Sequence, residues 1–374
     1  MSLPTRQLGR NGPKVTGIGL GLMSFAGWYK QQDLSEETAL AFLDRAYELG
    51  ERFWDTADVY TNSEERVGAW FKKTGKRDDI FLATKFALRH TPQGRVLDND
   101  PAYVKEACAK SLEKLGTDTI DLYYCHRVDD KTPIEHTIKA MAELKNEGKI
   151  RYLGLSECSA ATIRRAHAVH PISAYQVEYN PLFLDIELPE IGILETCREL
   201  GIAIVAYSPV ARGMLTGSIK SHADLSAGDF RASVPKFSEA NFPKITALVD
   251  RIRAVGERHG GATPAQVCLA WVAAQGDDFI SIPGTARTKY LEENVGALRV
   301  GLSDDEVAEL RGYAEATELS GSRYPGDDFV DNANMGSKLA KESREERTSL
   351  HVQRKMKANS TVAEPYLISL VHIA

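Results

Sequence analysis

Short apolar runs alternate with amphipathic stretches along most of the chain. Runs rich in β-branched and aromatic residues predict strands, whereas apolar positions three and four residues apart predict helices. The predicted strands are residues 18–23, 53–56, 80–84, 120–125, 150–155, 174–178, 202–207 and 279–283. A hairpin is also predicted over residues 6–15, because Asn11-Gly12 accepts the positive φ angles of a tight turn.

Helix signals fall between these strands. Ser35 can cap a helix that ends before Gly50, and Asp100-Pro101 can open another, since Asp is a good N-cap and Pro is tolerated at the first helical position. Capping-box spacing occurs at residues 132–135, 263–266 and 303–306, and helices are also predicted at residues 160–169, 191–200 and 288–298.

Eight strands alternating with helices predict a parallel α/β sheet, and eight such units predict a closed (β/α)8 TIM barrel. The rival is an open doubly wound sheet, which would carry G-x-G-x-x-G after its first strand. Gly17, Gly19 and Gly21 do not complete this pattern, because Leu22 stands where its third glycine would be. No helix is predicted to follow them. We therefore expect one barrel domain over residues 1–330, with an N-terminal β-hairpin and an extra C-terminal helix.

Two segments depart from the repeat. The connection between Ser208 and Phe242 is long, and long connections in compact domains are often functional, so a lid is predicted there. Residues 331–374 are mostly polar and charged and show no period that would pack on a barrel. They are expected to form an appended, mobile tail.

Composition narrows the class of protein. Hydrophobic residues make up 43% and charged residues 26% of the 374 positions, which is typical of a globular protein. The formal net charge of −6 argues against a dedicated nucleic-acid partner. The five cysteines form no Cys-x-x-Cys pair, and no run approaches the roughly 18 apolar residues of a membrane span. These features predict a cytoplasmic protein with reduced thiols and no membrane partner.

Residues at the carboxyl ends of barrel strands point into a shared mouth, so chemistry is sought there. The second, third and fourth strands end at Asp55, Lys85 and His126, and Tyr60 follows Asp55 in the next loop. An ammonium lowers the pKa of a neighbouring phenol, which would make Tyr60 a proton donor, and a carboxylate offsets the cost of burying that ammonium. His126 could orient a substrate oxygen. Taken singly, each residue could equally hold a turn, pack or be solvated.

If these four residues serve a reductase, the enzyme needs a nicotinamide cofactor, because side chains contain no hydride source. Later strand ends offer Ser156, Glu157 and Gln176 for a carboxamide and Tyr207 for stacking on the nicotinamide ring. Residues 282–289 lead into a helix N-terminus, which favours phosphate. Arg287 and Lys289 could select NADPH there, although a plain helix cap with solvated charges is the alternative.

Other motifs carry no function. His167 and His170 lie three residues apart on a predicted helix, but no third ligand accompanies them, so no metal site is predicted. Gly-x-Ser-x-Gly and a P-loop are absent, which removes the simplest hydrolase and nucleotide-hydrolase interpretations.

Several segments together resemble the aldo-keto reductase superfamily. They are residues 53–60 with Ser63-Glu64-Glu65, residues 82–85, residues 111–116 together with 121–123, residues 148–156 and residues 282–285. The resemblance extends over about residues 8–300 and implies the same barrel. It places the family's catalytic tetrad on Asp55, Tyr60, Lys85 and His126, with Tyr60 as general acid.

The resemblance also implies NADPH as cofactor, with the pyrophosphate on residues 208–217 and the adenosine end near residues 287–294. The cofactor contacts predicted in this way and from the strand ends are Gly21, Met23, Asp55, Ser156, Glu157, Gln176, Tyr207, Ser208, Pro209, Arg212, Gly213, Leu215, Gly217, Pro283, Gly284, Thr285, Arg287, Lys289, Glu293 and Asn294. Many members of the family carry Asn where this chain has Glu157, which can only accept from the carboxamide NH2. Predicted substrate contacts are His126, Trp28 and Tyr29.

The expected activity is NADPH-dependent reduction of an aldehyde or ketone to an alcohol. The branch looks most similar to plant and fungal reductases of natural-product carbonyls in secondary metabolism. One alternative is a cofactor-binding regulatory subunit, because potassium-channel β subunits resemble the same family. Another makes Lys85 the Schiff-base lysine of a barrel aldolase. The sequence leaves the physiological carbonyl and the oligomeric state open.

Overall fold

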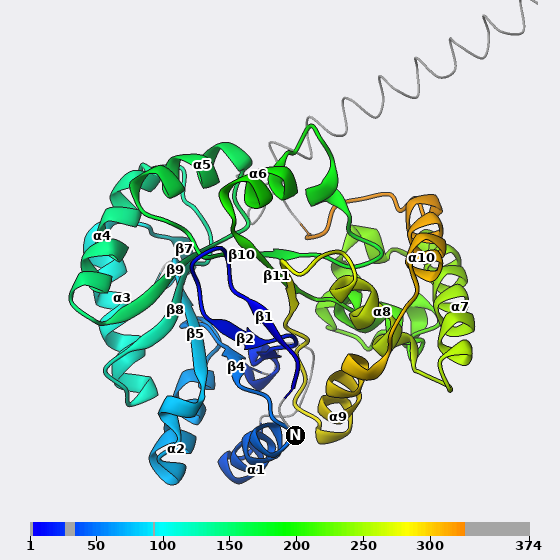
Figure 1. Cartoon of the computed structure of the whole chain (residues 1–374), viewed down its shortest axis with the longest axis horizontal. Helices are drawn as coiled ribbons and strands as arrows, with labels where there is room; N and C mark the ends of the chain where they lie inside the picture. Colours follow the sequence, from blue (N-terminus) through cyan, green and yellow to red (C-terminus); the bar gives the residue numbers. More distant parts are fainter. Residues whose placement is uncertain (1–2, 27–33, 93, 326–374) are drawn as a thin grey trace, which may run out of the picture.

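A ring of eight parallel strands forms the centre of the protein in a computed structural model that describes residues 3–26, 34–92 and 94–325 (Figure 1). In sheet order the strands are β3 (Leu20–Gly21), β4 (Phe53–Asp55), β5 (Phe81–Phe86), β8 (Ile120–Cys125), β9 (Ile150–Ser156), β10 (Ala174–Glu178), β11 (Ala203–Tyr207) and β12 (Phe279–Ser281). Parallel bridges from Ile18 to Ser281 and from Gly21 to Gly284 join the first and last strands. The predicted TIM barrel is confirmed.

Helices surround this ring. They are α1 (Glu36–Glu48), α2 (Ser63–Thr74), α3 (Pro101–Leu115), α4 (Ile134–Asn146), α5 (Ala160–Val169), α6 (Ile193–Leu200), α7 (Phe242–Arg258), α8 (Pro264–Ala273), α9 (Thr288–Gly296) and α10 (Asp304–Ala316). The predicted capping boxes at Thr263 and Ser303 are confirmed, and Ser35 accepts from the Thr38 N–H as predicted. The box predicted at Thr132 is wrong: Pro133 is the N-cap, and the Thr132 hydroxyl donates to Asp129 instead.

Two hairpins flank the barrel. In the predicted one, β1 (Thr5–Gln7) pairs with β2 (Lys14–Thr16), and Arg6 lies opposite Val15. Its Leu8 and Val15 pack inside the ring, in a cluster that includes Phe53 and Ala174 at the starts of their strands, so this hairpin closes the amino-terminal end of the barrel. The second hairpin, β6 (Leu88–Thr91) and β7 (Gly94–Leu97), was not predicted.

The segment after β11 differs from the predicted lid. Residues 208–241 form short 3₁₀ turns, namely η4 (Ala211–Thr216), η5 (His222–Asp224), η6 (Phe230–Ser233), η7 (Pro235–Phe237) and η8 (Glu239–Asn241). Met214, Leu215 and Phe237 are fully buried against the helices, so this segment is packed in the structure.

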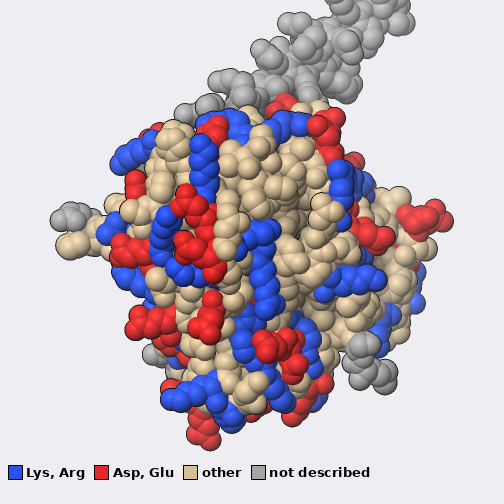
Figure 2. Space-filling model, turned by 60° about the vertical axis from the view of Figure 1, so that its left-hand side comes forward, with Lys and Arg blue, Asp and Glu red and all other residues tan. Residues whose placement is uncertain are grey.

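The surface carries charges of both signs. Figure 2 shows Lys and Arg interspersed with Asp and Glu over the face it presents, in keeping with the mild net charge. Among the described residues, no helix is long and apolar enough to cross a membrane, and no cluster of His, Cys, Asp and Glu could hold a metal ion. Trp28, Tyr29 and the predicted tail lie outside the described residues.

Candidate active site

Four side chains predicted from the strand ends meet at the carboxyl-terminal end of the barrel. The Lys85 ammonium donates hydrogen bonds to Asp55 and, at 2.8 Å, to the Thr56 carbonyl oxygen. Its nitrogen lies 5.1 Å from the centre of the Tyr60 ring. The Tyr60 and His126 rings meet edge to face, with centres 5.9 Å apart. The parallel sheet therefore brings together residues separated by about seventy positions, because the carboxyl ends of its strands share one edge.

Asp55 and Lys85 form an ion pair with almost no solvent exposure. Burial raises the pKa of Asp55 and lowers the pKa of Lys85, and the attraction between the two charges opposes both shifts. Gln176 donates to the second oxygen of Asp55 at 2.8 Å. Both carboxylate oxygens are therefore satisfied inside the protein, which holds the Lys85 ammonium in place.

The environment of Tyr60 differs from the predicted one. Burial raises the pKa of its phenol, the Asp55 charge raises that pKa further, and the nearby Arg127 cation lowers it. The predicted lowering by Lys85 does not dominate, because the charge of that ammonium is balanced by Asp55. The phenol is consequently protonated at neutral pH, which is the state a proton donor requires.

His126 is neutral in this environment. Burial and the cations Arg127 and Lys85 hold the pKa of its ring well below the ordinary range. Its Nδ1 atom is buried and has no hydrogen-bond partner among the described residues. Unsatisfied buried polar atoms are uncommon and costly, so this nitrogen marks a position where a ligand group would complete the site.

The residues predicted for the nicotinamide carboxamide lie side by side at the ends of β9 and β10. Ser156 Oγ accepts from Arg127 at 3.3 Å. Glu157 accepts from Arg323 at 2.8 Å and from the Tyr207 hydroxyl at 2.8 Å. Although burial alone would raise it, Arg323 brings the pKa of Glu157 down to about 2. Glu157 is thus ionised and already engaged by the protein.

A segment following α10 covers this end of the barrel. Besides the contact between Arg323 and Glu157, the Tyr324 hydroxyl lies 2.8 Å from the Tyr207 hydroxyl. Arg212 pairs with the buried Glu178 at 2.8 Å and lies over the Tyr324 ring at 4.6 Å. Sequence reasoning missed Arg127, Glu178, Arg323 and Tyr324. Arg127 and Glu178 lie at strand ends, so the argument from strand ends could have found them. Arg323 and Tyr324 follow a helix, and no local sequence pattern marks them.

The loop predicted to bind pyrophosphate has an unusual backbone. Ala211, Arg212 and Gly213 are consecutive residues with positive φ angles of 50°, 56° and 90°, and Ser208 and Gly217 also have positive φ. The Ala211 and Gly213 N–H groups are already used, because they donate to the Ser208 and Val210 carbonyls at 2.8 and 3.0 Å. Pro209 and Leu215 belong to the same loop, and Leu215 is buried. The positive φ angles therefore shape the loop, and a pyrophosphate contact there stays a prediction.

The predicted adenosine end has the features of an anion site. Helix α9 begins after Arg287, and no side chain caps its N-terminus. Arg287 and Lys289 are exposed and form no ion pair with any residue in the described ranges. An uncapped N-terminus beside two available cations favours a phosphate over the plain-cap alternative.

The remaining predicted contacts frame this end of the barrel. The Gly21 N–H donates to the Pro283 carbonyl at 3.2 Å, and Gly284 lies against Gly21, where a side chain would crowd the strands. Thr285 accepts from the Arg287 N–H at 3.1 Å. Met23 begins a 3₁₀ turn after β3, while Glu293 and Asn294 lie on α9, with Asn294 buried.

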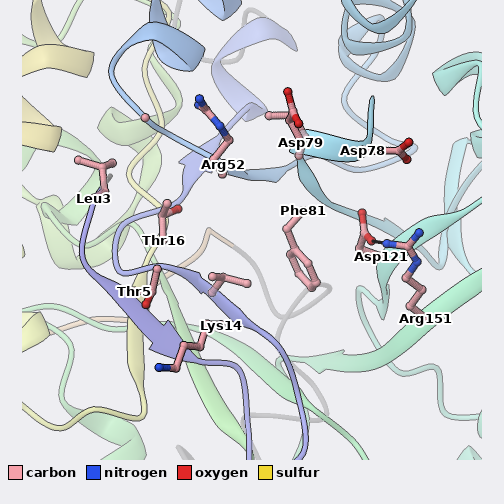
Figure 3. Close-up of a pocket in the computed structure, with 13 residues that line it drawn as sticks. Leu3, Thr5, Lys14, Thr16, Arg52, Asp78, Asp79, Phe81, Asp121 and Arg151 are labelled. Carbon is pink, nitrogen blue, oxygen red and sulfur yellow. Dashed lines mark hydrogen bonds and ion pairs between the residues drawn. The ribbon is translucent and has the colours of Figure 1, made fainter. Parts of the chain in front are cut away.

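A cavity of about 500 Å³ lies at the opposite, amino-terminal end of the barrel (Figure 3). Asp121 in its wall accepts from Arg77 at 2.8 Å, Arg151 at 2.6 Å and the Leu82 N–H at 2.9 Å. Phe81 supplies an apolar wall. The buried Asp121 carboxylate is fully satisfied by protein donors, so it has no open oxygen for a ligand.

Comparison with known proteins gives consistent results. The profile of the aldo/keto reductase family matches residues 17–315. Aldo-keto reductase str7 of Strobilurus tenacellus is 55% identical over 91% of this chain and 98% of its own length. Aldo-keto reductase yakc [NADP(+)] of Schizosaccharomyces pombe is 50% identical over 87% of this chain and 95% of its own length.

Solved structures agree with the fold. The thermostable aldo-keto reductase Tm1743, in complex with the inhibitor epalrestat, superimposes with a TM-score of 0.67 at 28% identity and covers 83% of this chain and 100% of its own. Glycerol dehydrogenase AKR11B4 from Gluconobacter oxydans gives a TM-score of 0.75 at 27% identity and covers 85% of this chain and 97% of its own.

Proposed function

This chain belongs to the aldo-keto reductase family, and from that premise we propose that it reduces an aldehyde or ketone to an alcohol with NADPH. The observation that carries the proposal is the meeting of Tyr60, Lys85 and His126 at one end of the barrel. A protonated phenol, a neutral imidazole with an unused nitrogen and a buried ammonium form a set suited to protonating a carbonyl oxygen.

When bound, NADPH supplies the hydride that reduces the carbonyl carbon. The loop from Ser208 to Gly217 takes the pyrophosphate, and the α9 N-terminus with Arg287 and Lys289 takes the 2′-phosphate. A relative at 50% identity carries NADP(+) in its name, which supports this cofactor. Since Glu157 already accepts hydrogen bonds from Arg323, the Tyr207 hydroxyl and the Glu178 N–H, Ser156 and Gln176 are the better candidates for the carboxamide.

The protein's own residues then handle the oxygen. Tyr60 donates its phenolic proton to the carbonyl oxygen, and solvent later restores that proton. A ring nitrogen of His126 donates a hydrogen bond to the same oxygen and orients it. The Lys85 ammonium, held by Asp55, lies 5.1 Å from the centre of the Tyr60 ring and favours the phenolate that forms, although Asp55 balances most of its charge before the reaction.

The physiological substrate is proposed to be a natural-product carbonyl, in line with the sequence resemblance, and the cytoplasmic location stays a prediction. The test is loss of NADPH absorbance with a panel of aromatic aldehydes and ketones. The proposal predicts substrate-dependent NADPH consumption and formation of the alcohol. Negligible turnover with every carbonyl, despite tight NADPH binding, would instead support the regulatory-subunit alternative. Borohydride trapping of substrate on Lys85 without NADPH would support the aldolase alternative.

A further inference from the structure

Arg127, at the carboxyl end of the barrel, forms no ion pair with a carboxylate of the described residues. It follows His126 directly, and one of its terminal nitrogens donates to the His126 carbonyl at 2.7 Å and to Ser156 Oγ at 3.3 Å. Its side chain is partly shielded from solvent. Within residues 3–26, 34–92 and 94–325, no acidic group forms an ion pair with it. The other guanidinium nitrogens therefore remain open to a ligand.

Three other cations of this end each have a counter-ion, whereas Arg287 and Lys289 at the start of α9 have none among the described residues. The pairs are Lys85 with Asp55, Arg212 with Glu178, and Arg323 with Glu157. Burial and the neighbouring Glu64 raise the pKa of Asp58 to about 7, so this carboxyl carries less than a full charge at neutral pH. Arg127, which stays protonated in proteins, thus leaves the mouth with a positive charge in excess.

Arg127 lies close to the position expected for the reacting carbonyl. Arg127 lies between His126, whose ring contacts Tyr60, and Ser156, at the end of β9. Its charge lowers the pKa of Tyr60 against the larger effect of burial, as a cation near the phenol does. A substrate group that binds Arg127 would accordingly lie close to the carbonyl that Tyr60 protonates.

We propose that Arg127 determines substrate specificity by binding a carboxylate on the carbonyl substrate. A guanidinium presents parallel N–H groups that match two carboxylate oxygens, and a charge-assisted pair of this kind binds more strongly than a neutral hydrogen bond. The enzyme would thereby favour aldehydes or ketones that carry an acid group over their neutral analogues. This inference rests on the proposed function and narrows its substrate class.

The test compares 4-carboxybenzaldehyde with methyl 4-formylbenzoate, which has similar shape and no charge. Wild-type enzyme is expected to show at least about tenfold higher kcat/KM for the acid, and Arg127→Met to lose that preference because its kcat/KM falls at least about tenfold more for the acid than for the ester. Arg127→Lys keeps the positive charge but lacks the parallel N–H groups of a guanidinium. Its preference for the acid should lie between those of wild type and Arg127→Met. Arg89→Met removes an exposed arginine paired with Asp98 and serves as the matched control.

A binding measurement complements the kinetics. Calorimetric titration of benzoate into the enzyme with NADP+ should show binding that Arg127→Met abolishes and Arg89→Met preserves. Equal loss on both aldehydes with a raised KM for NADPH would overturn the inference, because Arg127 would then serve the cofactor. Equal wild-type rates on acid and ester would also overturn it while leaving the proposed function standing. Turnover of neither aldehyde would contradict the proposed function itself.

Discussion

The two ends of the barrel both bury charged side chains, yet they use them differently. At the amino-terminal end, Asp121 accepts from two arginines and a backbone N–H, and Arg6 donates to the carbonyl oxygens of three residues near β12. At the carboxyl-terminal end, His126 Nδ1 and Glu178 Oε1 are buried without partners in the described part of the chain. Arg127 has no counter-ion there.

This difference distinguishes charged groups that stabilise the fold from charged groups that can bind a ligand. Buried ionised groups occur at both ends, and the cavity of about 500 Å³ lies at the end opposite the tetrad. Neither burial nor cavity size therefore identifies the candidate site. Open groups that lie beside the tetrad do, because groups satisfied within the protein stabilise the fold, whereas open groups next to other site residues can bind a ligand. An open atom alone is not enough, since Trp54 Nε1 is also buried without a partner in the described part of the chain.

The largest expected effect comes from Tyr60→Phe at the carboxyl end. Removing the phenolic proton should lower kcat by about 10²–10⁴-fold, the range typical of a lost general acid. NADPH affinity, followed by fluorescence titration, should stay near the wild-type value. Tyr47→Phe removes the phenol that donates to Asp79 on the outer surface, and it should leave kcat unchanged. Near-normal turnover in Tyr60→Phe would remove this residue from its proposed role.

Asp121→Asn should produce the opposite pattern at the amino end. It leaves Arg77 and Arg151 without their shared carboxylate, so the free energy of unfolding should fall by about 2–4 kcal/mol. Urea denaturation measures this loss, and kcat/KM at a temperature where the variant is folded should match wild type. A large fall in kcat/KM with unchanged stability would break the distinction between the two ends.

Glu51→Gln at the amino end should have a smaller, pH-dependent effect. Burial raises the pKa of Glu51 to about 8, whereas an unfolded Glu titrates near pH 4.3. Between these values only the folded state holds the proton, so wild-type stability falls as pH rises. The variant, which can still accept from Thr16, should lack this pH dependence, so its stability relative to wild type should rise between pH 5 and 8. Melting temperatures from pH 5 to 9 test this; a constant difference would argue against it.

Much of this arrangement was predictable from local sequence signals. Strands 120–125 and 174–178 and helix 160–169 have the predicted bounds, because apolar periodicity and flanking turn residues agree there. The four tetrad positions followed from one topological rule, since parallel barrel strands end at a common rim.

What the sequence did not reveal depends on distant packing. The sequence predicted no bounds for helices α2 and α7, and the Thr132 hydroxyl binds Asp129 rather than capping a helix. The pKa of Tyr60 depends on burial by segments remote in sequence, which opposes the effect expected from Lys85 alone. Arg323 and Tyr324 reach Glu157 and Tyr207 across more than 100 positions, and no local pattern encodes such contacts.

Hydrogen–deuterium exchange with and without NADP+ tests most directly which end of the barrel is functional. The account predicts slower exchange at residues 208–217 and 284–294 when the cofactor is present, and unchanged exchange at residues 3–16, 50–52 and 78–81 around the amino-terminal cavity. Protection confined to that cavity, with no change in the two carboxyl-end segments, would contradict it.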